Sequence, residues 1–332
     1  MKQRLVWLDA LKGIGILSIM RIHMIAPMEL LQSIIYVGAV SMFFVCAGFN
    51  FHTSGNARNL LISKAKRLLI PYFFYSIILI ILEHRIDFST ISQVFGILYA
   101  RMSIYRGSAE GYLLIGNAPM WFLPCMFVSY IWLIMIYSKC KTNIHKIIVA
   151  TSFFFISAIL SYCPIIFPWS LDTSFLLTTL IILGYELRER FLHTTKWLTC
   201  IATVSWLILY YFFVGSNISI GYYGEYGIIS IIAFMLIAIA ETYSLSGILQ
   251  MTDNTWITKA LSYIGQQSLR LMCIHLIIYI RLTDFLSANA QSIYTNKWLL
   301  LCISFSFILI INAIMDVIIK KLQNRINWVK YI

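Results

Sequence analysis

Three ionisable side chains lie on one face of an apolar stretch where charge is costly, and a fourth, Arg21, points elsewhere. Asp9, Lys12 and His23 belong to residues 5–25, LVWLDALKGIGILSIMRIHMI, which are long enough to cross a bilayer as a helix. A rotation of about 100° per residue puts Lys12 and His23 on one face, roughly 16 Å apart along the axis, with Asp9 close enough to pair with Lys12. That face must line protein or water, because lipid could not accept it.

Two interpretations of this polar face are open. The ionisable groups could close a buried network that only fixes how the helices pack. Alternatively, His23 could be a general base at the end of a polar shaft, because imidazole is the side chain whose unperturbed pKa lies near the working pH. Ionisable residues inside membranes are functional by default, which favours the second interpretation.

The same residues resemble a known signature. The run LDALKGIGILSIMRIH is similar to the N-terminal signature of the acyltransferase-3 family of integral-membrane acyltransferases, in which Leu-Asp, a basic residue and Gly precede a His eleven positions after the basic residue. Lys12 and His23 match the two positions associated with acyl transfer. The resemblance implies that His23 deprotonates an acceptor hydroxyl or carries the acyl group, while Lys12 holds the donor or tunes His23 and Asp9 neutralises Lys12.

Composition defines the broad class. A chain of 332 residues that is 60% hydrophobic and 11% charged is a polytopic membrane protein. The net charge of +12 could suggest nucleic acid, but the positions of the basic residues indicate membrane topology, so no nucleic-acid partner is expected. The seven cysteines include no CxxC pair, which predicts neither a disulfide framework nor a metal site.

About ten apolar windows predict an all-α membrane fold, taken as a single domain over residues 1–332 and surrounded by membrane lipids. The windows are residues 5–25, 32–52, 68–83, 119–137, 146–163, 174–187, 197–214, 226–245, 263–281 and 298–319. Ten spans place both termini in the cytoplasm, and 17 Lys and Arg residues then fall inside against five outside. The expected location is the inner membrane of a bacterium.

A donor site is predicted near the third span. The second span ends in SMFFVCAGFNF, similar to the family's FF-x-x-SGF element but with Ala47 in place of Ser, and Gly48 there would let another backbone approach. Lys64 and Arg67 follow in SKAKRLLIPYFF, a string typical of the family. Either they only set topology, or they meet the phosphates of acetyl-CoA, since a basic helix start supplies cations and free N–H donors. Acetyl-CoA would be a co-substrate, and no cofactor or metal is expected.

An acceptor site is predicted on the outer side. Residues 84–118 combine Tyr with Arg, Asp, Glu and Asn, a composition that suits sugars but also suits an interfacial aromatic belt. Arg106, Asn117 and Trp121 are the candidates, and NAPMWFLPCMF resembles the WFL motif of the family's sugar O-acetyltransferase, fucose acetylase-like branch. Asp172, in PIIFPWSLDTSF, either faces the acceptor or caps the sixth span.

The C-terminal part adds a second histidine. LSYIGQQSLRLMCIHL resembles the family's L-x-x-x-G-x-x-S-x-x-x-Y-x-x-H element without its aromatic residue. His275 should lie at a depth comparable with His23, where the two could act as a base and its orienting partner, although a lone buried His is often only packed. Arg270 should lie deeper and could line the donor path.

These features together predict a membrane O-acyltransferase that moves acetyl from cytoplasmic acetyl-CoA to a hydroxyl of a lipid-linked glycan or surface polysaccharide of the cell envelope. The donor and the acceptor class come from the resemblance. A glycan transporter or flippase would share the ten spans and buried charges, but no inverted repeat is evident. An N-acyltransferase for a small amino-sugar or amino-acid acceptor would share the machinery. The chain has no GKS phosphate loop, HExxH or GxSxG motif, so ATPase, zinc protease and serine hydrolase functions lack support.

Overall fold

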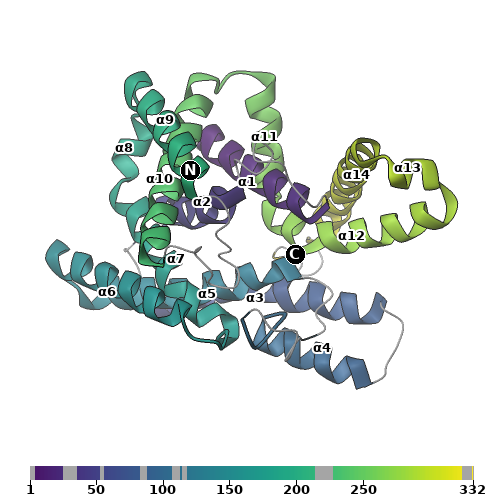
Figure 1. Ribbon diagram of the computed structural model, residues 1–332, viewed down its shortest axis with the longest axis horizontal. Coiled ribbons are helices and arrows are strands. Elements are labelled where there is room, and N and C mark those ends of the chain that lie inside the picture. The colour runs from purple at the N-terminus through teal and green to yellow at the C-terminus, as the bar shows by residue number, and fades with distance from the viewer. Residues whose placement is uncertain are drawn as a thin grey trace.

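The computed structural model is helical throughout the parts of the chain that it describes, which are residues 4–24, 36–52, 56–82, 88–106, 113, 118–213, 227–323 and 331. The only β-type pairing among these residues is an isolated bridge between Tyr105 and Ile165. The helices, drawn in Figure 1, are α1 (Val6–Met24), α2 (Tyr36–Phe49), α3 (Ala57–Leu82), α4 (Phe88–Tyr99), η2 (Ala118–Trp121), α5 (Phe122–Lys139), α6 (Asn143–Ser161), η3 (Pro168–Ser170), α7 (Leu171–Glu186), α8 (Arg188–Leu192), α9 (Lys196–Phe213), α10 (Ile228–Met251), α11 (Trp256–Gln266), α12 (Ser268–Asn289), α13 (Gln291–Thr295) and α14 (Lys297–Gln323).

Each of the ten predicted spans corresponds to a helix. Seven described helices are long and apolar enough to cross a membrane, namely α3, α5, α6, α9, α10, α12 and α14. The other three are α1, which carries Asp9, Lys12 and Arg21, and the shorter α2 and α7, with 14 and 16 residues. The all-α polytopic membrane fold is therefore confirmed, while the orientation in the membrane stays a prediction.

The third span differs from its prediction. The window 68–83 is only the second half of α3, which begins at Ala57. Lys64 and Arg67 thus lie about two to three turns inside the helix, where backbone N–H groups are used by the helix itself. The prediction of free N–H donors beside Lys64 and Arg67 is therefore wrong. A hydropathy window misses this segment because ARNLLISKAKR is helical but rich in polar side chains.

Two further helices of more than ten residues were not expected. Helix α4 lies within the outer segment 84–118 that was read as a connection, and α11 ends at Gln266, so the ninth span begins at Ser268 and not at residue 263. Both helices are too short to span a bilayer. They pack beside spans, α4 against α3 and α11 against α1.

Helix α1 occupies the centre of the bundle. It packs against α2, α10, α11 and α12, and Figure 1 shows these helices around it. Its contact with α11 is backbone to backbone: a Cβ added at Gly13 would stand 2.1 Å from the carbonyl oxygen of Leu261, and one added at Gly265 would stand 1.7 Å from that of Asp9. Glycine at both positions is what lets the two helices approach so closely.

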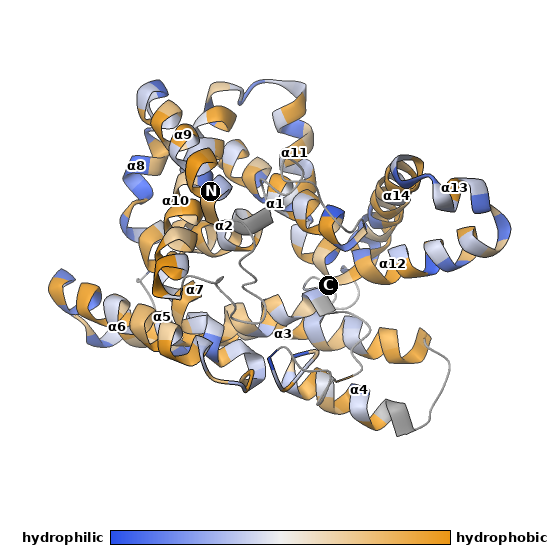
Figure 2. Ribbon diagram, in the orientation of Figure 1, coloured by the Kyte–Doolittle hydropathy of each residue, from blue (hydrophilic) through white to orange (hydrophobic). Residues whose placement is uncertain are grey.

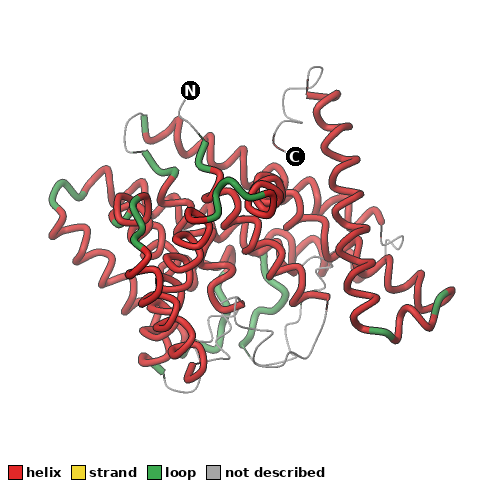
Figure 3. Tube along the Cα trace, turned by 90° about the horizontal axis from the view of Figure 1, so that it is seen from above, coloured by secondary structure: helices red, strands yellow, loops and turns green. Residues whose placement is uncertain are grey.

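Helices α2 and α7 meet in the same way. A Cβ at Gly48 would lie 2.3 Å from the carbonyl oxygen of Ile181, so the close approach predicted at Gly48 is confirmed. The outer surfaces of the bundle are apolar, as the colouring in Figure 2 shows, and α6, α9 and α14 expose residues such as Ile159, Ile208 and Ile310. Helices α12, α13 and α14 extend to one side of the bundle in both Figure 1 and Figure 3.

Candidate active site

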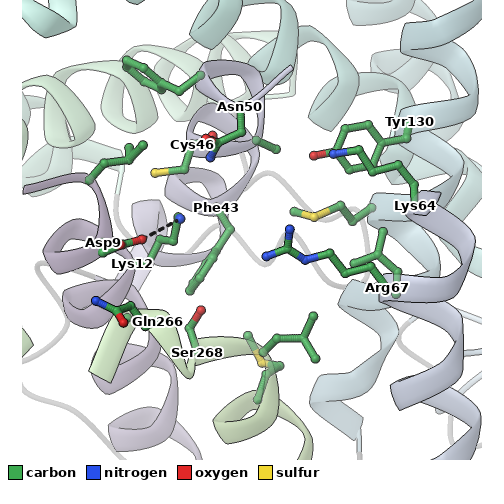
Figure 4. Close-up of a pocket in the computed structure, with 18 of the residues that line it drawn as sticks. Asp9, Lys12, Phe43, Cys46, Asn50, Lys64, Arg67, Tyr130, Gln266 and Ser268 are labelled. Atoms are coloured by element: carbon green, nitrogen blue, oxygen red, sulfur yellow. Dashed lines mark hydrogen bonds and ion pairs between the residues drawn. The ribbon is translucent and has the colours of Figure 1, made fainter. Parts of the chain in front are cut away.

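A cavity of about 620 Å³ lies between α1, α2, α3, α5, α11 and α12. Its walls carry five Lys or Arg residues and one acidic residue, which are Arg4, Lys12, Lys64, Arg67, Arg188 and Asp9, and His52 also lines it. Figure 4 shows Asp9 and Lys12 on one side and Lys64, Arg67 and Tyr130 on the other. The cavity is therefore strongly basic, which suits an anionic ligand.

The α1 wall holds the predicted pair. Lys12 Nζ lies 3.1 Å from Asp9 Oδ1, and Arg4 binds the other carboxylate oxygen. Asp9 is 4% exposed, whereas the Lys12 side chain keeps 22% of its surface accessible and lines the cavity. The pairing of Asp9 with Lys12 is confirmed, and Arg4 is a second partner that sequence reasoning did not identify.

The α3 wall brings Lys64 and Arg67 to the same cavity. Lys64 Nζ lies 4.0 Å from the ring centroid of Tyr130, a cation–π contact. The Arg67 guanidinium projects into the cavity (Figure 4), and within the described parts of the chain it makes no ion pair. Both residues are therefore available to an anion, even though they do not stand at a helix start.

Arg188 and Arg270 both differ from the predicted donor path. Arg188, at the first position of α8, lines the cavity and was not predicted. Arg270 was predicted on the donor path, yet it does not line the cavity. Its guanidinium contacts Asn312 at 2.7 Å and Asp316 at 3.0 Å on α14. Gln266, the last residue of α11, does line the cavity.

The two histidines meet, as predicted. The ring centroids of His23 and His275 are 5.5 Å apart, and His23 is exposed whereas His275 is fully buried. His275 Nδ1 lies 2.9 Å from the carbonyl oxygen of Leu271. Because a carbonyl only accepts, Nδ1 is the donor, and a neutral ring then presents the lone pair of Nε2. That Nε2 is buried and has no hydrogen-bond partner among the described residues. The catalytic roles of the pair stay a prediction.

The histidine pair lies past the end of the cavity. Lys12 lines the cavity, and His23 follows it eleven residues later on α1, a rise of roughly 16 Å. Met272 also lines the cavity, and His275 comes one turn further along α12. A ligand that fills the cavity from its basic end would therefore need an extended arm to reach the histidines.

The outer candidates form a separate cluster. Asp172, on the first turn of α7, is 2% exposed, and its carboxylate contacts Arg106 and lies 3.6 Å from the guanidinium of Arg101. Arg101 also lies over the ring of Trp121, 5.0 Å from its centroid. Sequence reasoning treated Arg101 only as an outer basic residue. The signal that could have identified it is that Asp172, an acidic residue within an apolar segment, needs a buried cationic partner. Asn117 lies outside the described residues.

The turn before α7 positions this cluster. Trp169 and Ser170 have left-handed backbone angles, with φ of 53° and 57°, which is costly for residues other than glycine. Trp169 Nε1 donates to the carbonyl of Leu98 at 2.7 Å, which joins the turn to α4. The carboxylate of Asp172 is held by arginines, an arrangement that the sequence did not suggest, and its contact with an acceptor stays a prediction.

A polytopic helical protein with a basic cavity and a histidine pair beyond it has the parts of a membrane-embedded group-transfer enzyme. In the described residues no group of three potential metal ligands occurs. Residues 5–317 match the acyltransferase-3 family, described as an acyltransferase domain, and the chain belongs to this family. It is an integral-membrane acyltransferase. No match was found among curated proteins or among solved structures.

Proposed function

We propose that this acyltransferase moves acetyl from cytoplasmic acetyl-CoA to a hydroxyl of a lipid-linked glycan or surface polysaccharide, in the inner membrane of a bacterium. The observation that carries the donor is the basic cavity. Coenzyme A bears about four negative charges at neutral pH, on a phosphomonoester and a diphosphate. Five basic residues and one acidic residue line the cavity, so its net charge is of the opposite sign and of similar size.

The arm of the donor supports the same assignment. With the phosphates at the basic walls, the pantetheine arm extends along α1 toward His23, over roughly the 16 Å that separates it from Lys12. His23 removes the proton of the acceptor hydroxyl, whose oxygen attacks the thioester carbonyl. The C–S bond breaks, an ester C–O bond forms, and the thiolate of coenzyme A takes up the proton from the histidine. His275 orients His23, and direct transfer and a transient acyl-histidine both fit this geometry.

The acceptor assignment rests on the outer side of the bundle. Trp121 directly precedes Phe122, which lines the cavity, and its ring is stacked on Arg101. An aromatic face beside charged side chains is the chemistry that binds sugars, since the ring contacts C–H surfaces and the polar groups bind hydroxyls. Asp172 lies 3.6 Å from Arg101 and also contacts Arg106, so these ion pairs hold Arg101 beside the ring.

The test uses purified protein in bilayers with radiolabelled acetyl-CoA and an extract of lipid-linked glycans. We expect label in a glycan with wild type, and loss of roughly 100-fold or more with His23→Ala, because the general base is removed. Lys12→Ala should also lower transfer. His193→Ala is the control, since His193 is exposed in the turn after α8.

The outcomes separate the alternatives. Label found on an amine of a small acceptor would mean that the enzyme forms an N-acyl product and not a sugar ester. Equal transfer by wild type and His23→Ala would refute the assigned base. Absence of transfer from acetyl-CoA to any acceptor would refute the proposed donor.

A further inference from the structure

Ring contacts place the two ends of the cavity along α1. Phe43 and Phe49, both on α2, line the cavity. The ring of Phe43 rests on α1 at Gly15, where an added Cβ would stand 3.0 Å from it, and the ring of Phe49 lies 5.7 Å from that of Trp7. Trp7 comes eight residues before Gly15, a rise of about 12 Å, and is the further of the two from His23. The end of the cavity beside Trp7 and Phe49 is called the distal end below.

Arg188 reaches the cavity at the distal end. It lines the cavity and is the first residue of α8, and the ring of Phe191 on the same helix lies 5.3 Å from that of Phe49. The end of α7, which leads into α8, is also held against α2: a Cβ added at Gly48 would stand 2.6 Å from the backbone nitrogen of Tyr185. Contacts on both sides of Arg188 thus fix its backbone to the end of α2.

The Arg188 side chain differs from the cations of the α1 wall. Arg4 and Lys12 share the carboxylate of Asp9. Arg188 makes no ion pair within the described residues, and its Nε is buried without a hydrogen-bond partner among them. A buried donor of a charged group that is left unpaired costs free energy, and a guanidinium stays charged at every working pH. An anion that enters the cavity at this point would remove that cost.

The cations of α3 lie elsewhere along the cavity. Lys64 Nζ lies 4.0 Å from the ring centroid of Tyr130. Tyr130 is midway along α5 between Phe122 and Tyr137, and those two residues contact rings in the middle of α2 and just after its end, respectively. Arg67 follows Lys64 by less than one turn of α3, and Figure 4 shows both on the side of Tyr130. The α3 pair therefore lies between the two ends of the cavity, whereas Arg188 lies at one of them.

The order of groups in coenzyme A is set by its covalent structure. The thioester is followed by the pantetheine arm, then the diphosphate, and finally the ribose, which carries the 3′-phosphate. In the proposed function, on which this inference rests, the thioester reaches His23 and the phosphates lie in the cavity. The diphosphate is then nearer to the histidines, at the level of the α3 pair, and the 3′-phosphate extends further toward the distal end.

We propose that Arg188 binds the ribose 3′-phosphate and makes the enzyme select coenzyme A thioesters over donors that lack this group. A phosphomonoester carries nearly two negative charges at neutral pH and three acceptor oxygens, and a guanidinium can bind two of these oxygens side by side. His52, which follows the end of α2 by three residues, lines the same end of the cavity. The 3′-phosphate takes no part in the chemistry, so this contact acts on donor affinity and selection.

The experiment is equilibrium titration of coenzyme A and of 3′-dephospho-coenzyme A, two ligands that differ only in this phosphate. The protein is held in discs of phosphatidylcholine, whose headgroup has no net charge and so does not compete for Arg188. Wild type should bind coenzyme A at least roughly tenfold more tightly than the dephospho form, because hydrogen bonds to charged groups are lost with the phosphate. Arg188→Gln should weaken coenzyme A by a similar factor and leave the Kd of the dephospho form unchanged.

Two variants act as controls. Arg67→Gln removes a cation from the α3 wall and should weaken both ligands by the same factor, because both carry the diphosphate. Arg190→Gln removes the same charge from α8, where Arg190 is exposed and does not line the cavity, and it should change neither Kd. A preference for the 3′-phosphate that disappears only in Arg188→Gln assigns this group to Arg188.

Equal affinity of wild type for the two ligands would overturn the proposal, and so would an undiminished preference in folded Arg188→Gln. If Arg188→Gln does not fold, Arg188→Lys takes its place. It keeps the charge without the planar fork and should retain only part of the preference, so an undiminished preference there has the same meaning. A wild-type protein that binds neither ligand contradicts the proposed donor instead.

Discussion

Arg67 should contribute more to donor binding than Lys64, although both line the cavity from α3. Arg67 makes no ion pair within the described residues, so a phosphate gains its full interaction. Hydrogen bonds to charged groups contribute about 1.5–3 kcal/mol, and the exposure of Arg67 favours the lower end. Arg67→Gln should therefore weaken the Kd for coenzyme A by at least roughly tenfold.

Lys64 differs from Arg67 because its ammonium group already has a contact in the free protein. Its Nζ already lies 4.0 Å from the ring centroid of Tyr130, and a phosphate that recruits it must compete with this contact, worth about 0.5–1 kcal/mol. The loss caused by Lys64→Gln should thus be roughly two- to fivefold smaller than that caused by Arg67→Gln. Tyr130→Leu should free Lys64 and tighten binding, whereas Tyr130→Phe keeps the ring and should change little.

The assay is equilibrium titration of labelled coenzyme A to protein in bilayer discs, at low and at high salt. Lys66→Gln is the matched control, because Lys66 lies on the same helix, is exposed and does not line the cavity. The losses should shrink at high salt, since exposed charges are screened. Equal affinity of wild type, Arg67→Gln and Lys64→Gln at low salt would refute the reasoning that phosphates bind at this wall.

Three further outcomes follow from contacts elsewhere. His275→Gln should lower kcat at least tenfold with little change in the KM for acetyl-CoA, less than the loss of the base itself; an unchanged kcat would remove His275 from the mechanism. Gly265→Ala should destabilise the protein by about 1–3 kcal/mol and weaken coenzyme A binding, because its Cβ would stand 1.7 Å from the carbonyl of Asp9; an unchanged melting temperature would contradict the close contact. Asp172→Asn should destabilise by about 3 kcal/mol or more, since the buried Arg101 and the partly buried Arg106 lose their shared carboxylate; thermal unfolding in detergent tests this, and full stability would mean that the ion pairs contribute nothing.

Much of the fold was predictable because hydropathy reports directly on the apolar length of a helix. Both the ten spans and the pairing of Asp9 with Lys12 follow from local spacing, which a helix translates into geometry without reference to the rest of the chain. The meeting of His23 and His275 also agreed with prediction, because both lie on adjacent spans at similar depth.

Contacts between distant segments were beyond this kind of reasoning. Arg188 and Arg270 are both basic residues near the ends of helices, and only the rotation of each helix decides that Arg188 faces the cavity while Arg270 faces Asn312. Arg101 was passed over because its partner Asp172 is 71 residues away. Glu241 gave a visible signal, an acid inside the apolar window 226–245, and the structure buries it completely against Gly38 at the start of α2.

The backbone contact between α1 and α11 connects the basic cavity to a helix with exposed aromatic side chains. Helix α11 exposes Trp256 and Tyr263, aromatic side chains that favour the boundary between lipid headgroups and acyl chains. At Gly13 and Gly265 no side chain separates the backbones of α1 and α11. A tilt of α11 would therefore also move the backbone at Asp9. We therefore expect the thickness and headgroup composition of the surrounding lipid to act on the position of Lys12, and the rate of acyl transfer to differ between membranes.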